Sequence, residues 1–107
     1  MATFDAARIF TMESSIKYTT GGVTSKQIIK SKEGNVTLFS FDKGQGLTEH
    51  SAAFDALVQV IDGEVEITLD DKLHNLKKGD CIIMPANVPH ALQAVESFKM
   101  ILTMIKD

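Results

Sequence analysis

The strongest constraint on this chain is a series of short β-rich runs separated by turn residues at intervals of roughly eight to twelve positions. The runs cover residues 26–30, 35–41, 56–61, 64–69, 81–84, 90–95 and 98–105. This spacing predicts an antiparallel β-sandwich or barrel with little helix beyond the N-terminus. With 107 residues, the chain has room for one such domain, so any site must lie inside or at the mouth of its single core.

Three turn sequences between the runs are expected to reverse the chain. Residues 33–35 include a glycine and an asparagine, residues 62–63 form an Asp-Gly pair typical of a tight hairpin, and residues 78–80 contain a third glycine. Such turns predict that neighbouring strands pair antiparallel. In residues 64–69 acids alternate with apolar side chains, so we expect one face in water and the other in the core.

The chain is expected to divide into an N-terminal segment, residues 1–34, and a barrel, residues 35–107. The segment is predicted to be partly β and to cover the barrel or a dimer partner. Within it, residues 6–10 can form a turn of helix and residues 19–22 a loop.

Two of the runs, 35–41 and 98–105, are apolar on both faces. A lone barrel of this length cannot bury all of these side chains, which predicts a homodimer packed sheet on sheet. The alternative is that Met100, Met104 and the phenylalanines thicken the core.

Composition excludes several classes of partner. The net charge is -3, and acids interrupt the lysines, so we expect no nucleic-acid partner. No stretch approaches the roughly 20 apolar residues of a membrane span, and the first ten residues lack the apolar run of a secretion signal. These features predict a cytoplasmic protein without membrane contact. Cys81 stands beside two isoleucines, which predicts a buried, unreactive thiol.

Residues 44–63 contain the first of two informative motifs. Gly44, His50 and Gly63 have the spacing of the first motif of the cupin family, which the segment resembles. Ala52 stands where that family carries a second histidine, and Ala56 where it carries a glutamate.

Residues 79–94 resemble the second cupin motif. Gly79, Pro85 and His90 match it, Asn87 replaces a glycine, and Ala94 replaces an asparagine. Asparagine still tolerates the left-handed backbone that glycine supplies. The resemblance covers roughly residues 35–105 and implies an all-β, antiparallel cupin-type barrel, the jelly-roll-like double-stranded β-helix.

In cupins, three histidines and a carboxylate converge on one cation, and the resemblance carries only His50 and His90 over to this chain. They are the candidate ligands of a divalent metal such as Zn, Ni, Mn or Fe. Asp55 and Glu49 are candidate replacement ligands, although each is one residue out of register and expected on the opposite face. Alternatively, the two histidines are interior polar residues, hydrogen-bonded to each other, to water or to the backbone. His74 is expected to be a solvent-side strand residue.

The residues that replace the missing ligands are small. If the strand at 56–61 alternates regularly, Ala56, Val58 and Val60 line the interior together with Ala52. The predicted pocket is apolar with two imidazoles at its centre. It suits a small, partly apolar molecule that carries a carboxylate or hydroxyl group.

Three functional hypotheses remain open. The first is a small-molecule-binding cupin with a degenerate two-histidine metal site. The second is a metal-dependent enzyme of oxygenase, isomerase or lyase type acting on a small oxygenated substrate. The third is a structural or interaction domain with a filled barrel. The sequence does not decide whether the protein is an enzyme, since cupin barrels carry many chemistries.

Overall fold

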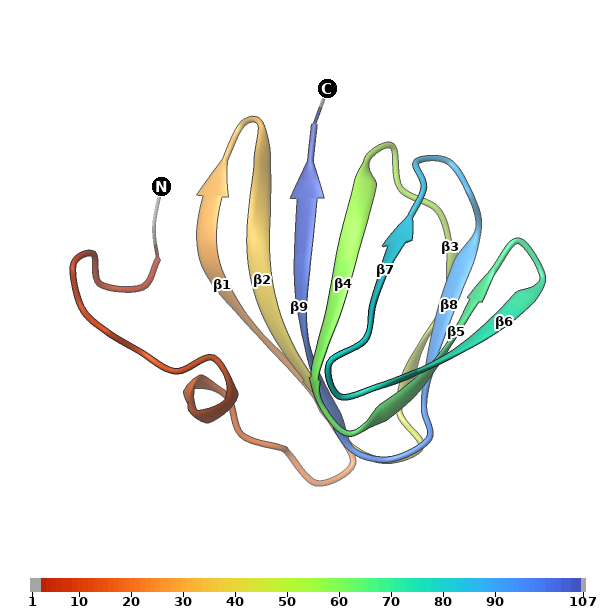
Figure 1. Ribbon diagram of the computed structural model, residues 1–107, viewed down its shortest axis with the longest axis horizontal. Helices are drawn as coiled ribbons and strands as arrows, with labels where there is room; N and C mark the ends of the chain where they lie inside the picture. The colour runs from red at the N-terminus through yellow and green to blue at the C-terminus, as the bar shows by residue number, and fades with distance from the viewer. Residues whose placement is uncertain (1–2, 107) are drawn as a thin grey trace.

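A computed structural model describes residues 3–106, in which nine strands follow a short 3₁₀ turn at Glu13–Ser15 (Figure 1). The strands are β1 Val23–Ser31, β2 Gly34–Phe41, β3 Gly46–His50, β4 Asp55–Asp62, β5 Glu64–Leu69, β6 Lys72–Lys77, β7 Cys81–Met84, β8 His90–Ala94 and β9 Phe98–Ile105. The ends of the two predicted segments, residues 1–2 and 107, lie outside the described residues.

The strands form two antiparallel sheets that face each other. A five-stranded sheet has the order β1-β2-β9-β4-β7, and a four-stranded sheet has the order β3-β8-β5-β6. The sheets converge at the end drawn lowest in Figure 1, here called the closed end, and splay apart at the opposite, open end. The predicted all-β, antiparallel jelly-roll fold is confirmed. Among residues 3–106, no helix has the length and hydropathy needed to cross a membrane.

The chain changes sheet at most of its connections, and this corrects part of the turn analysis. The interpretation of residues 62–63 as a hairpin is wrong, because β4 and β5 belong to different sheets. Gly63 has φ 77° and a Cβ there would lie 1.9 Å from the Ser97 carbonyl oxygen, so the crossing requires glycine. Residues 78–80 likewise carry the chain from β6 to β7 in the other sheet.

A hairpin that the sequence analysis did not identify joins β5 and β6. Its central residues, Asp70 and Asp71, have φ of 48° and 68°, as a type I′ turn requires at both positions. The turn signal was weak because neither residue is glycine. The strand β3 was also missed, since it is short and largely exposed.

The main core fills the space between the sheets. Alternation along β4 places Ala56, Val58 and Val60 on the inner face, where all three are buried. Phe41 of β2 and Phe98 of β9 stack at the closed end with ring centroids 4.5 Å apart. The other buried members of this cluster are Val65, Ile67, Leu76, Met84, Leu92, Ala94 and Met100.

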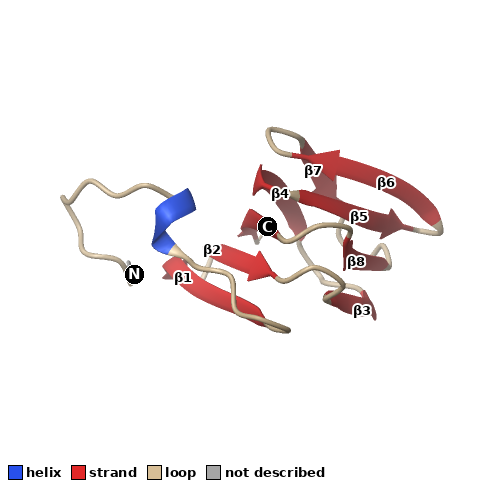
Figure 2. Cartoon of the chain, turned by 90° about the horizontal axis from the view of Figure 1, so that it is seen from below, coloured by secondary structure: helices blue, strands red, loops and turns tan. Residues whose placement is uncertain are grey.

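A second, smaller cluster lies on the outer face of the five-stranded sheet. Ile28, Leu38 and Ile101 are buried there beneath Ile16 of the N-terminal segment. The segment therefore covers part of its own sheet and lies beside β1 and β2 in Figure 2. The helical turn expected at residues 6–10 is wrong: that stretch holds no helix, and the 3₁₀ turn follows it. A single isolated helical turn has too few hydrogen bonds to offset its ordering entropy.

Tyr18 attaches the N-terminal segment to the closed end. Its hydroxyl donates to the Asp62 carboxylate at 2.5 Å, and the Lys99 ammonium lies 5.0 Å from its ring centroid. Burial and the neighbouring Asp62 carboxylate raise the pKa of Tyr18 well above its usual range. The phenol therefore remains a hydrogen-bond donor at neutral pH.

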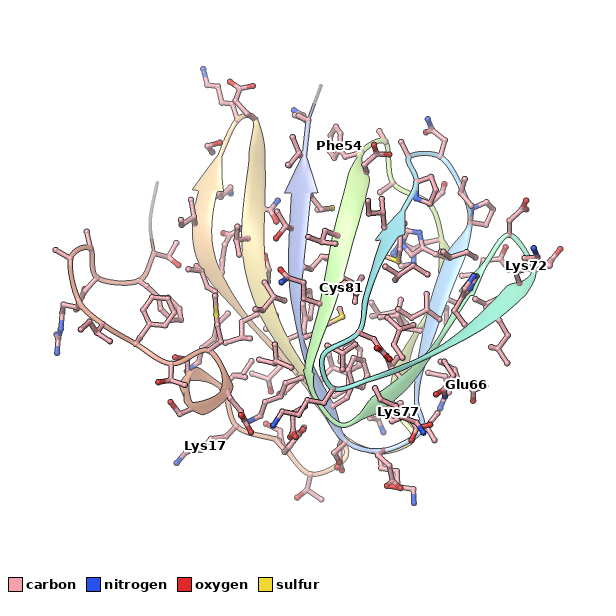
Figure 3. The ribbon with its side chains drawn as sticks, in the orientation of Figure 1. Lys17, Phe54, Glu66, Lys72, Lys77 and Cys81 are labelled. Carbon is pink, nitrogen blue, oxygen red and sulfur yellow. The ribbon has the colours of Figure 1, made fainter. Side chains whose placement is uncertain are left out.

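The prediction that Cys81 is buried is wrong. Cys81 begins β7 at the edge of the five-stranded sheet, and its thiol is exposed (Figure 3). It is paired with Gln59 on the outer face, whereas Ile82, paired with Val58, takes the inner face. Apolar neighbours in sequence do not bury a strand residue when alternation turns it outward.

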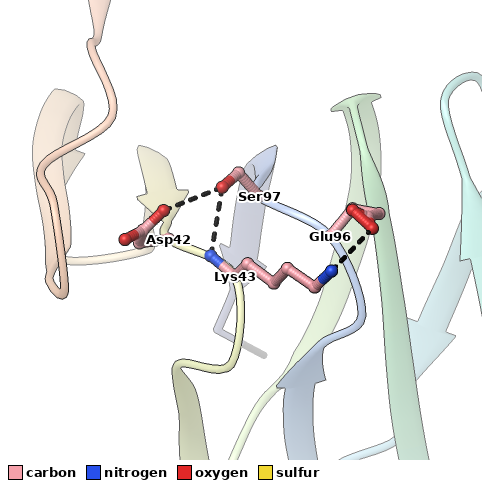
Figure 4. Close-up of polar contacts among 4 residues, drawn as sticks. All are labelled: Asp42, Lys43, Glu96 and Ser97. Carbon is pink, nitrogen blue, oxygen red and sulfur yellow. Dashed lines mark hydrogen bonds and ion pairs between the residues drawn. The ribbon is translucent and has the colours of Figure 1, made fainter.

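Asp42 ties three connections together at the closed end (Figure 4). Its carboxylate accepts hydrogen bonds from the Gly21 amide at 2.6 Å and the Ser97 hydroxyl at 2.9 Å. The Lys43 amide donates to the same hydroxyl, and the Lys43 ammonium pairs with Glu96 at 3.2 Å. The hydrogen bond from the Gly21 amide lowers the pKa of Asp42 below its ordinary value, and the hydrogen bond from the Ser97 hydroxyl lowers it further.

We expect Asp42→Asn to lower the midpoint of urea unfolding at pH 7. Because the pKa of Asp42 is lower in the folded state, its carboxylate stabilises the fold at pH values above the unfolded pKa of about 3.9. This stabilisation is lost as the pH falls through the folded-state pKa. The difference in midpoint between wild type and variant should therefore shrink as the pH falls below about 4. Urea unfolding followed by circular dichroism across this range checks it, and a difference independent of pH contradicts it.

Candidate functional site

Two histidines from neighbouring strands meet at the open end of the barrel. His50 ends β3, His90 begins β8, and the register places them directly opposite each other. Their Nε2 atoms lie 3.0 Å apart, and their ring planes are inclined at 67°. The fold thus joins two imidazoles that are 40 positions apart in the sequence.

A bulge in β3 turns His50 toward His90. From Leu47 to His50 the strand advances by three residues, while its partner advances by two from Leu92 to His90. Because side chains alternate, regular pairing from Leu47 would direct Glu49 inward and His50 outward. The extra residue reverses this and leaves Glu49 exposed. The motif spacing identified His50, but the bulge orients it.

The hydrogen bonds of the two rings determine where their protons reside. His50 Nδ1 lies 2.8 Å from the Thr48 carbonyl oxygen, and His90 Nδ1 lies 3.3 Å from that of Val88. A carbonyl oxygen only accepts, so each Nδ1 is the donor. In neutral rings both Nε2 atoms then carry lone pairs, and these two atoms lie 3.0 Å apart. The pair therefore offers two acceptors to a metal cation or to a hydrogen-bond donor.

The two rings differ in burial. The His90 side chain is 5% exposed, whereas His50 is exposed at the rim. Burial lowers the pKa of His90, the hydrogen bond to Val88 opposes this, and the charge of His50 lowers it further. The buried ring is therefore neutral at pH 7, which is the form that binds metals. His50 forms the solvent side of the pair.

The pair fits two positions around a divalent cation, because two ligands about 2.1 Å from one cation and at right angles lie about 3 Å apart. The described chain does not supply a full ligand set: residues 3–106 contain no group of three or more His, Cys, Asp or Glu side chains placed to hold a metal ion. A cation here needs further ligands from water or from a bound molecule.

The candidate replacement carboxylates do not complete the pair. Asp55 is exposed on the opposite face of β4 from Ala56, and its carboxylate accepts the Ala86 amide at 2.8 Å. That contact ties the start of β4 to the loop between β7 and β8. Glu49 is exposed at the bulge.

The loops around the pair follow the motif pattern closely. The Asn87 amide donates to the Ala52 carbonyl at 2.7 Å, which joins the two loops at the open end. Asn87 has φ 64°, so the prediction of a left-handed asparagine is confirmed. Ala52 is half-buried, whereas Val58 and Val60 are packed into the core below. The predicted pocket lined by these residues remains a prediction.

A hollow that the sequence analysis missed lies on the outer face of the four-stranded sheet. It has a volume of about 420 Å³, and its polar side chains include Thr48, Thr68, Glu66 and Gln93. Glu66 is visible on this side of the sheet in Figure 3. Its lining comes from four strands, so no local pattern in the sequence indicates it.

Comparison with known protein families matches residues 37–106 to the cupin domain. The chain belongs to the cupin family. This confirms the resemblance drawn from the two motifs. No match was found among curated proteins.

Solved structures of other proteins resemble this one over most of its length. A conserved protein of unknown function from Streptococcus pyogenes is 34% identical, with a TM-score of 0.92 over 97% of this chain and 91% of that chain. A cupin superfamily protein from Desulfitobacterium hafniense DCB-2 is 29% identical, with a TM-score of 0.90 over 96% and 94%. A cupin 2 conserved barrel domain protein from Leptotrichia buccalis is 39% identical, with a TM-score of 0.88, but this cupin spans only 47% of it.

We expect the imidazole of His90 to titrate below the ordinary value of about 6.5, and His50→Ala to raise its pKa toward that value. Because the pKa of His90 is lower in the folded state, the unfolded chain binds more protons at pH values between the folded and unfolded pKa of this residue. The free energy of unfolding should therefore fall as the pH falls from about 6.5 through the pKa of His90. Nitrogen-15 NMR of the rings checks both the titration and the proton at Nδ1. A His90 midpoint unchanged in the variant contradicts the coupling.

Proposed function

We propose that this cupin binds a small molecule carrying a carboxylate or hydroxyl oxygen at the open end of its barrel, with the His50–His90 pair as the polar anchor. The observation that carries the proposal is the meeting of two Nε2 atoms at 3.0 Å on rings whose Nδ1 atoms both contact carbonyl oxygens. A hydroxyl group can donate to a free Nε2 atom, and a cation held by the pair attracts a carboxylate oxygen.

The surroundings of the pair support a ligand with one polar end and an apolar body. Leu69 lies directly opposite His90 on β5 and packs against the main core. Apolar surface therefore adjoins the buried imidazole, while the exposed His50 faces solvent. A few polar groups set against apolar walls are typical of small-molecule sites.

A metal-dependent enzyme is the second candidate function, favoured by the spacing of the two lone pairs. His50 and His90 would hold Zn, Ni, Mn or Fe, and the cation would polarise an oxygen of the substrate. In this alternative the protein contributes the two imidazoles and their orientation by the Thr48 and Val88 carbonyls. Because residues 3–106 supply no group of three or more metal-ligating side chains, the small-molecule binder is the preferred function.

The first test compares wild type with the double variant His50→Ala, His90→Ala. His74→Ala is a matched control, because its Nδ1 also contacts a carbonyl, that of Lys72 at 3.1 Å, but on β6. Thermal shift with a panel of small hydroxy acids should raise the unfolding temperature of wild type and the control, but not of the double variant. Elemental analysis and calorimetry with Zn²⁺ or Ni²⁺ alone should show binding at least about tenfold weaker in the double variant.

The outcomes separate the three hypotheses. A ligand-dependent shift in a metal-free wild type supports the binder. Near-stoichiometric metal in the wild type that is absent from the double variant favours the enzyme. Neither a ligand shift nor metal binding points to a structural domain with a filled barrel.

A second test restores the family ligands. Ala52→His combined with Ala56→Glu should raise Zn²⁺ affinity by a factor of about 100 or more, because the pair gains an imidazole and a carboxylate. Without metal, the variant should unfold at a lower temperature than wild type, since Ala56 is buried and a carboxylate there loses hydration. Calorimetry and thermal unfolding with and without Zn²⁺ check both effects. No gain in affinity contradicts the placement of these positions beside the histidines.

A further inference from the structure

A small hollow lies at the rim of the open end, on the side of the five-stranded sheet. It has a volume of about 150 Å³ and is here called the rim hollow. The turn between β1 and β2, the residue before β4 and the end of β9 form its wall. Figure 3 shows Phe54 at this end of the barrel. The lining residues are Ser31, Lys32, Gly34, Asn35, Phe54, Met104 and Lys106.

Backbone contacts bring the two lysines of the rim hollow to the same part of the fold. The Lys106 amide donates to the Glu33 carbonyl at 2.6 Å, and Glu33 follows Lys32 in the turn between β1 and β2. A Cβ on the next residue, Gly34, would lie 2.1 Å from the Met104 carbonyl oxygen. Only a glycine therefore lets this turn approach β9 so closely.

The polar side chains of the rim hollow favour an anion. Lys32 and Lys106 carry ammonium groups, and neither forms an ion pair with a carboxylate of the described chain. The Oδ1 atom of Asn35 accepts a hydrogen bond from the Thr37 hydroxyl at 3.3 Å, so the amide NH₂ group is left to donate. Among the described residues, no acidic side chain lines the hollow. Positive charge and hydrogen-bond donors therefore occur there together.

The local charge differs in sign from that of the whole chain. The net charge of the protein is -3, whereas the rim hollow carries two ammonium groups. Like charges that share a hollow repel each other, and a bound anion relieves this repulsion. The Lys106 ammonium also lies 5.3 Å from the centroid of the Phe54 ring, a cation–π contact that holds it at the rim.

The apolar side of the rim hollow favours an organic anion over an inorganic one. The side chains of Phe54 and Met104 are both half-buried. Met104 faces the barrel interior, since its direct partner on β4 is the buried Ala56. A volume of about 150 Å³ is large enough for a benzene ring.

We infer that the rim hollow binds a small aromatic acid. Lys32 and Lys106 are the charged partners of its carboxylate, and the Asn35 amide is a further donor. The aromatic ring of the acid packs against Phe54 and Met104. A few polar groups beside apolar side chains are typical of a small-molecule site.

Sodium benzoate and its neutral analogue benzamide test the charge requirement on the wild-type protein. In proton–nitrogen-15 NMR titrations, benzoate should shift the amide signals of Gly34, Asn35 and Lys106. Benzamide should bind at least about tenfold more weakly, because it lacks the charge that the ammonium groups recognise. Sodium phosphate should also bind at least about tenfold more weakly, because it gains nothing from apolar contact. Absence of these shifts with benzoate, or equal affinity for benzoate and either control, overturns the inference.

A matched pair of double variants locates the bound carboxylate. Lys32→Gln with Lys106→Gln removes both ammonium groups of the rim hollow. Lys77→Gln with Lys78→Gln removes two exposed ammonium groups near the closed end, where Figure 3 shows Lys77. The two variants have the same net charge, so overall charge cannot distinguish them. The first should weaken benzoate binding by at least about tenfold, and the second by no more than about twofold. Equal effects of the two overturn the inference.

The variant His50→Ala, His90→Ala separates this inference from the proposed function. Both histidines belong to the four-stranded sheet, whereas the rim hollow is built on the five-stranded sheet. The folded variant should therefore bind benzoate as tightly as wild type, whether or not small hydroxy acids bind at the histidine pair. Such hydroxy acids lack the aromatic ring that the rim hollow requires. If the folded variant no longer binds benzoate, the carboxylate belongs at the histidine pair and the inference is overturned.

Discussion

The apolar layer between the two sheets is the interaction on which the rest of the structure depends. The stacked Phe41 and Phe98 rings and the buried residues of β4 hold the sheets together toward the closed end. The chain can cross from sheet to sheet there because Gly63 adopts positive φ where any side chain would meet Ser97. Since this layer occupies the interior, polar chemistry is confined to the open end, where the sheets splay and the two histidines meet.

At that end, the chemistry of the site depends on the hydrogen bonds of the two imidazole rings. Backbone carbonyls fix the protons of His50 and His90 at Nδ1, which leaves two unprotonated Nε2 atoms 3.0 Å apart. Burial lowers the pKa of His90, so this ring resists protonation and its Nε2 atom stays an acceptor. The pair therefore offers two acceptors to a cation or to a hydrogen-bond donor.

The outer face of the five-stranded sheet is only partly buried, unlike the interior. The N-terminal segment buries the second cluster, but Ile83 and Ile105 of the same sheet stay exposed. Sheet alternation produces both faces from the same strands, so β4 and β9 carry apolar side chains outward as well as inward.

The sequence by itself determined the positions of most strands, because periodicity and turn residues are local. It also determined which face of β4 is buried, the left-handed Asn87 and the spacing that identifies His50 and His90. Only the tertiary structure decided which strands belong to which sheet. Residues 62–63 resemble a hairpin turn, yet the flanking strands β4 and β5 pack in different sheets on either side of the core. The same holds for the exposure of Cys81.

The orientation of the site likewise came from tertiary structure. The one-residue bulge in β3 turns His50 inward and Glu49 outward, and no local sequence signal specifies it. The free Nε2 atoms depend on the carbonyls of Thr48, in β3, and of Val88, in the loop before β8. Local preferences fix where strands begin and end, whereas their pairing, and with it the chemistry of the site, depends on contacts between residues far apart in the chain.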